Sequence, residues 1–151
     1  MPRYEDERIV AYGLFIKGFA TVHRHISESM EERAGLPLPW FELLLRIAQS
    51  DDGRLKMSEL ARHLFLTTGG VTRLVDRIVE AGLVVRQPCP TDRRVQWVGL
   101  TDLGHVEFER AVTCHLADLD RCFIGPLSAD ELAALTHTLA KLADAIDSSS
   151  S

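Results

Sequence analysis

The sequence predicts a mainly α-helical protein, a winged helix-turn-helix with long N- and C-terminal helices for dimerisation. Apolar residues recur at three- and four-residue steps over most of the chain, which is the spacing of a helix face. The pattern is interrupted at residues 83–101, where two short apolar runs flank a turn containing Pro88 and Pro90. Runs of this kind are typical of a β-hairpin. Two short helices joined by a tight turn precede this hairpin, and together they predict the winged fold.

The N-terminal part of the chain is predicted to form two helices. The first runs from residue 5 to about residue 33, and Gly35 and Pro37 end it. The second begins at Pro39, a residue that suits a first helical position, and continues to about Ser50. Residues 51–54 are predicted to form a turn.

The central helices are shorter. Ser58 is the expected N-cap of the first, and a tight FLTTGG connection leads to a second helix from Thr68 to Ala81, which Gly82 ends. The buried stripe of this second helix is expected to consist of Val71, Leu74, Val75 and Ile78.

The C-terminal part is predicted to form two more helices. Thr101 caps the first, which runs to about Ile124, and Ser128 with Glu131 forms a capping box for the second. The terminal helices carry more leucine and aromatic surface than a small winged domain can bury, so we expect them to dimerise. The expected domains are dimerisation helices at 1–38 and 101–147, a winged helix-turn-helix lobe at 39–100, and a disordered tail at 148–151.

Composition excludes several classes of protein. Hydrophobic residues make up 46% of the chain and charged residues 26%, which is ordinary for a globular protein, and no apolar run is long enough to predict a membrane span. Three cysteines without a CxxC pair favour free thiols in a reducing cytoplasm. Fingerprints of hydrolases and nucleotide-binding enzymes are missing, as are the His and Cys spacings of zinc sites. We therefore expect neither an enzyme nor a cofactor.

Charge is distributed unevenly along the chain. The net charge is -5, yet residues 54–94 contain eight basic and four acidic residues, a net of +4. The remaining residues carry a net of −9. A basic segment within an acidic chain is the electrostatic pattern of a protein that binds nucleic acid through one surface.

The second central helix is the expected reader of the DNA major groove, which is wide enough for one helix. Arg73 and Arg77 lie opposite its buried stripe, where they could contact guanine or phosphate, or be solvated partners of Asp76 and Glu80. Small residues at the start of this helix would allow close approach to the DNA backbone. The candidate DNA contacts are Thr67, Thr68, Gly69, Gly70, Thr72, Arg73 and Arg77 on this helix, with Asp92, Arg93 and Arg94 at the hairpin tip.

Two stretches, MSELARHLFLTTGGVTRLVDRIVEAGLV and CPTDRRVQWVGLTDLG, carry a family resemblance. With them the chain resembles the MarR family of bacterial transcription regulators over nearly its whole length. The resemblance implies a homodimer that binds a palindromic double-stranded operator, commonly as a repressor, and is released by a phenolic or lipophilic effector. It also implies that Asp92 orients Arg94, which enters the minor groove. The chain departs from the family at Gly69 and Gly70, where polar side chains are more usual.

The resemblance further places an effector pocket where the dimerisation helices meet the winged lobe. The candidate lining residues are Phe19, His23, Trp40 and Leu44, for which a plain core role is the alternative. Three other hypotheses stay open. Cys89 in the wing could make the protein redox-responsive, histidines could make it metal-responsive, and the winged helix could bind protein in place of DNA.

Overall fold

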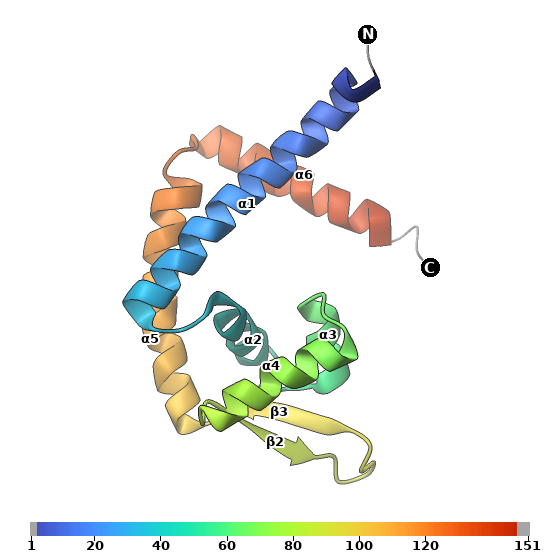
Figure 1. Ribbon diagram of the computed structural model, residues 1–151, viewed down its shortest axis with the longest axis vertical. Helices are drawn as coiled ribbons and strands as arrows, with labels where there is room; N and C mark the ends of the chain where they lie inside the picture. Colours follow the sequence, from blue (N-terminus) through green and yellow to red (C-terminus); the bar gives the residue numbers. More distant parts are fainter. Residues whose placement is uncertain (1–2, 148–151) are drawn as a thin grey trace. The chain divides into compact units, whose positions relative to one another are not determined.

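The computed structural model describes residues 3–147. In chain order the elements are a 3-10 turn (Arg3–Glu5), α1 (Glu7–Ala34), α2 (Leu38–Ala48), β1 (Arg54–Lys56), α3 (Met57–His63), α4 (Thr68–Glu80), β2 (Val84–Pro88), β3 (Gln96–Leu100), α5 (Asp102–Leu119), a π-helical turn (Asp120–Ile124) and α6 (Ala129–Asp147) (Figure 1). The chain forms two compact units. One contains residues up to Ile26 and from Leu116 onward, and the other is Ser27–His115. The tail predicted at 148–151 lies outside the described residues.

The unit Ser27–His115 contains an antiparallel three-stranded sheet in the order β1-β3-β2. Helices α2, α3 and α4 pack against this sheet, and α4 lies over the β2–β3 hairpin (Figure 1). In the core, Phe41 of α2 stacks on Phe108 of α5 with ring centroids 5.6 Å apart. The largest fully buried apolar side chains of this unit are Phe41, Met30, Leu43, Leu44, Ile47, Leu60, Ile78, Val71, Val75, Val84 and Val98. Burying a side chain of this kind contributes about 1.5–3 kcal/mol, so this core is the main source of the unit's stability.

Helix α4 has the predicted amphipathic pattern. Val71, Val75 and Ile78 are buried and Leu74 is half-buried, so the predicted stripe is confirmed. Gly82, at φ +77°, ends the helix in a left-handed conformation. Leu83 then donates its N–H to the carbonyl of Ile78 at 3.1 Å, which closes the helix end.

Of two local predictions before α4, one was wrong. The predicted turn is present at residues 51–53, and from Arg54 the chain continues as strand β1, which the sequence did not predict and which pairs with β3. The wrong prediction is the N-cap of α3, because this helix begins at Met57, ahead of the predicted cap Ser58. The Glu59 carboxylate accepts the backbone N–H of Lys56 at 2.8 Å, which fixes Lys56 as the N-cap, two residues before the predicted serine cap. A strand of three residues is too short to show alternation, and its pairing partners lie more than forty residues away in the sequence.

The start of α5 is pressed against the end of α4. As predicted, Thr101 caps α5, and its Oγ1 accepts the N–H of Gly104 at 3.0 Å. The same hydroxyl donates to the Gly82 carbonyl at 2.6 Å, and the Thr101 N–H donates to the Leu83 carbonyl at 3.0 Å. A Cβ at Gly104 would lie 1.9 Å from that Leu83 oxygen, so only glycine allows this close approach.

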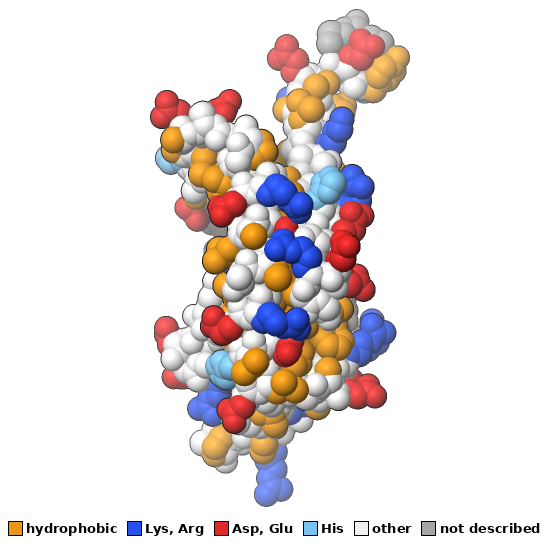
Figure 2. Space-filling view, turned by 90° about the vertical axis from the view of Figure 1, so that its left-hand side faces the viewer, with side chains coloured by type: hydrophobic (Ala, Val, Ile, Leu, Met, Phe, Trp, Pro, Cys, Tyr) orange, Lys and Arg blue, Asp and Glu red, His pale blue; other side chains and the backbone are white. Residues whose placement is uncertain are grey.

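The other unit has little internal burial. The capping box predicted for α6 is present, with the Ser128 N–H donating to the Glu131 carboxylate at 2.8 Å and the Glu131 N–H donating to Ser128 Oγ at 3.3 Å. None of the described side chains of α6, at 129–145, is buried. Large apolar side chains are exposed along the first turns of α1, as the orange groups at the top of Figure 2 show. They include Ile9, Val10, Tyr12, Leu14, Phe15, Ile16 and Phe19. Within residues 3–147, no helix combines the length and apolar character needed to cross a membrane.

Candidate nucleic-acid interface

The polar face of α4 leaves two arginines without an internal ionic partner. Arg73 and Arg77 are exposed, and within the described part of the chain no salt bridge involves either of them. The Asp76 carboxylate forms an ion pair with Arg86 Nη2 of the wing strand β2 at 2.6 Å. The alternative in which Asp76 and Glu80 pair with the two helix arginines therefore finds no ion pair in the described part of the chain. Both guanidinium groups are free for an external anion.

The first turn of α4 is built from small residues. Thr67 caps the helix, and its Oγ1 accepts the Gly70 N–H at 3.1 Å, so this N–H is not available to a phosphate. Thr68 and Gly69 are exposed, and the Thr72 hydroxyl donates to the Thr68 carbonyl at 2.8 Å. The Arg73 Nη1 atom lies 3.5 Å from where a Gly69 Cβ would stand, which brings the guanidinium beside this first turn.

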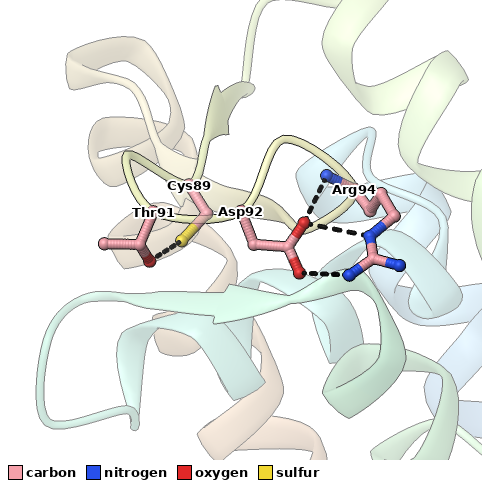
Figure 3. A network of polar contacts seen from close by, with 4 residues as sticks. All are labelled: Cys89, Thr91, Asp92 and Arg94. Atoms are coloured by element: carbon pink, nitrogen blue, oxygen red, sulfur yellow. Dashed lines mark hydrogen bonds and ion pairs between the residues drawn. The ribbon is translucent and has the colours of Figure 1, made fainter.

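The tip of the wing holds Arg94 in a bidentate pair with Asp92 (Figure 3). Arg94 donates from Nε to Oδ1 at 3.2 Å, from Nη2 to Oδ2 at 3.3 Å, and from its backbone N–H to Oδ1 at 3.0 Å. These bonds, those of the Arg94 side chain first, lower the pKa of Asp92. Arg94 remains 91% exposed, and Arg93 is exposed beside it. The carboxylate thus orients one guanidinium without burying it.

Cys89 lies in the same turn, with its Sγ atom 3.3 Å from Thr91 Oγ1 (Figure 3). The Thr91 hydroxyl, followed by the backbone of Thr91 and Asp92, lowers the pKa of the Cys89 thiol to about 7. Hydrogen bonds within the turn are therefore the main cause of the lowered thiol pKa. A substantial fraction of Cys89 is therefore thiolate at neutral pH.

Two cations that the sequence did not place lie beside strand β3 of the wing. Arg54 and Lys56 of β1 lie over the ring of Trp97 on β3, with the guanidinium carbon 4.8 Å and the ammonium nitrogen 5.1 Å from the ring centroid. Both distances are in the range of a cation–π interaction. Strand β1 has too few residues to show a pattern of its own, so these two cations could be placed only once its pairing with β3 was known.

The residues proposed for an effector pocket fall into two pairs. Phe19 and His23 lie together on α1 with ring centroids 5.2 Å apart, and Phe19 is exposed. Trp40 and Leu44 lie on α2, in the other compact unit, and Leu44 is fully buried in its core. A cavity of about 340 Å³ in the unit of Phe19 is lined by Thr21, Val22, His25, Arg121 and Cys122. Among residues 3–147, no three His, Cys, Asp or Glu side chains are grouped so as to hold a metal ion.

An arginine-bearing helix and an arginine-tipped hairpin in one compact unit define a winged helix-turn-helix of the nucleic-acid-binding type. Residues 34–95 match the model of the MarR family. The transcriptional repressor MdtR from Bacillus subtilis is 31% identical over 129 residues, which cover 85% of this chain and 81% of MdtR. The chain therefore belongs to the MarR family of transcriptional regulators, as predicted, and this role is not enzymatic.

Solved structures agree with this assignment. Sco3205, a MarR family transcriptional regulator from Streptomyces coelicolor solved in complex with DNA, has a TM-score of 0.85 and 26% identity, covering 93% of this chain and 92% of Sco3205. A mutant MarR from E. coli complexed with operator DNA has a TM-score of 0.81 and 26% identity, covering 94% and 99%. The mainly α-helical winged helix-turn-helix class is confirmed.

Proposed function

We propose that this chain is a sequence-specific repressor that binds a palindromic double-stranded DNA operator as a homodimer and is released by a small aromatic or lipophilic effector. The observation that carries the proposal is the wing tip, where Asp92 fixes an Arg94 guanidinium that stays almost fully exposed. An oriented, solvated arginine suits insertion into a narrow minor groove, where negative potential is concentrated. DNA binding belongs to residues 39–100, and dimerisation to 1–38 and 101–147.

Helix α4 supplies the second contact surface. Arg73 and Arg77 are free of internal ion pairs and one helical turn apart, so both can face one stretch of DNA. Each could contact a guanine edge in the major groove or a phosphate beside it. The two relatives solved with DNA have the same fold, which supports this docking of α4 and the wing.

The homodimer is supported by apolar surface on α1. Tyr12 and Phe19 are 67% and 62% exposed, and five further large apolar side chains between Ile9 and Ile16 are also exposed. An exposed apolar surface of this extent marks an interface. A second copy of the chain would cover this surface. A twofold dimer of winged helices then requires two symmetric half-sites about one DNA turn apart.

The decisive experiment is selection of bound duplexes from a random DNA pool, followed by titration of the selected operator. A palindrome is expected, with affinity that falls steeply as salt increases because bound counterions are released. A module that binds protein would select no palindrome and would show little salt dependence in its interactions with DNA.

Arg94→Ala tests the wing directly. It should weaken operator binding by about 1–3 kcal/mol, the value of one good charged groove contact. Arg8→Ala is a matched control, because Arg8 forms the same bidentate pair with Asp6, with Nε–Oδ1 at 2.9 Å and Nη2–Oδ2 at 2.7 Å, and is 89% exposed. Equal losses in both variants would indicate a general charge effect, and no loss in Arg94→Ala would refute the assignment.

Arg73→Ala separates two roles for the helix face. A loss of affinity that is equal on all DNA sequences identifies Arg73 as a phosphate contact, whereas a loss confined to certain base pairs identifies a base contact. The proposed release by effector is tested with a small phenolic acid, which should raise the melting temperature and dissociate the operator. An unchanged response in Trp40→Ala would remove Trp40 from the pocket.

Redox control through Cys89 is a second candidate mode of regulation. It is favoured by the lowered thiol pKa and by the position of Cys89 three residues before Asp92, in the turn that orients Arg94. Modification of this thiol would disturb the turn and weaken operator binding. Alkylation should therefore release DNA from the wild-type protein but not from a Cys89→Ser variant.

A further inference from the structure

The turn between α3 and α4 contains an unusual aromatic residue. Phe65 has φ +53° and is the one non-glycine residue with positive φ among residues 3–147. Its side chain is also 95% exposed. A left-handed conformation is costly for a residue with a Cβ, and an exposed ring gains almost nothing from burial in return. Phe65 is therefore unfavourable for the stability of the isolated chain.

The backbone explains why position 65 must be left-handed. The Phe65 N–H donates to the Arg62 carbonyl at 3.3 Å and the Leu66 N–H donates to the Ala61 carbonyl at 2.9 Å, the pair of bonds that closes a Schellman motif. The same pair closes α4, from Gly82 to Val79 at 2.9 Å and from Leu83 to Ile78. Glycine occupies the left-handed position at the end of α4, as physical chemistry favours, and phenylalanine occupies it at the end of α3.

The location of Phe65 indicates its partner. It lies two residues before Thr67, the N-cap of α4, and so continues the exposed surface formed by Thr68 and Gly69. Arg62 and His63, just before it, are exposed as well. An apolar ring near Arg62, just before the start of a groove-reading helix, fits the rim of a duplex, where phosphates surround apolar base and sugar atoms.

We propose that the Phe65 ring packs against an apolar surface of the operator, either the C5-methyl group of a thymine at the edge of the major groove or a deoxyribose beside it. This inference rests on the proposed function and adds an apolar contact to the arginine contacts of α4 and the wing. It also accounts for the strain, because backbone strain is retained where the strained residue serves binding.

Phe65→Gly separates stability from binding. Glycine relieves the left-handed strain, so the melting temperature should rise by about 2–4 °C. Loss of the ring should weaken operator binding about tenfold at matched salt. Phe65→Tyr keeps the ring and should bind nearly as well as wild type.

Replacing each operator thymine with deoxyuridine identifies the atoms contacted. A methyl contact predicts that one replacement per half-site weakens wild-type binding but has no further effect on Phe65→Gly. A deoxyribose contact predicts that Phe65→Gly loses affinity on all sequences. It also predicts that each thymine replacement changes the affinity of Phe65→Gly and of wild type by the same factor. Operator binding by Phe65→Gly at wild-type affinity would overturn the inference. The same result is expected if the ring contacts a protein partner in place of DNA. Absence of operator binding by the wild-type protein would refute the proposed function itself.

Discussion

Gly104→Ala should destabilise the winged unit by overcrowding the junction between α4 and α5. The new Cβ would lie 1.9 Å from the Leu83 carbonyl oxygen, whereas real Cβ contacts essentially never fall below 3.0 Å. Leu83 is buried, and its carbonyl also accepts the N–H of Thr101, so it cannot move without weakening the hydrogen bond that starts α5.

Gly104→Ala changes the free energy of unfolding through three contributions, one stabilising and two destabilising. Replacing glycine with alanine within a helix stabilises by about 1 kcal/mol. Overpacking a closed site costs about 1–3 kcal/mol. Weakening the Thr101–Leu83 hydrogen bond costs about 1 kcal/mol more. The expected net loss of unfolding free energy is about 1–3 kcal/mol, which lowers the melting temperature of a chain of this size by about 3–10 °C.

Calorimetry at matched protein concentration measures this effect, since association makes the melting temperature depend on concentration. Gly99→Ala is the control, because its Cβ would lie at an ordinary 3.5 Å from the nearest atom, the Gly53 carbonyl oxygen. That variant should melt within about 2 °C of wild type. A melting temperature for Gly104→Ala equal to or above wild type would show that the junction is looser than the backbone positions imply.

Three further predictions concern single side chains. Ser128→Ala removes one bond of the α6 capping box and should cost about 1 kcal/mol of unfolding free energy, measured by urea denaturation. Alkylation of Cys89 should be half-maximal near pH 7, because its thiol pKa is about 7, with Cys89→Ser as the unreactive blank. Because Arg94 lowers the pKa of Asp92, their ion pair should persist as the pH falls through the ordinary carboxyl range of about 4 and be lost only below it. An NMR titration of the Asp92 carboxyl carbon that ends at an ordinary midpoint would contradict this.

The parts of the fold that sequence analysis predicted correctly depend on local interactions. The stripe of α4 follows from helical spacing, and the caps at Thr101 and Ser128 depend on residues three positions away. The bidentate pair of Asp92 and Arg94 was predictable for the same reason, because these residues are two positions apart in one turn. The roles of these two residues in binding DNA remain predictions.

The features that were missed depend on residues far apart in the sequence, on competing caps, or on a backbone conformation that the residue type disfavours. Strand β1 exists because β3 pairs with it, and three residues carry no periodic signal of their own. The start of α3 at Met57 was missed because Ser58 is a good cap by composition, while the Glu59 carboxylate selects an earlier start. The left-handed Phe65 could not be foreseen, since residue preference assigns such positions to glycine.

The two cations that flank Trp97 make the wing observable by fluorescence. The chain has two tryptophans, so a Trp40→Phe variant leaves Trp97 as its single indole emitter. Indole emission responds to nearby charge, and Arg54 and Lys56 lie on β1, whereas Trp97 lies on β3 next to Gln96, where the chain enters this strand from the wing tip. Any displacement of β3 against β1 when the tip engages a ligand would change the distance between ring and cations. The hairpin thus carries an intrinsic optical reporter, which can follow wing motion in real time without an attached dye.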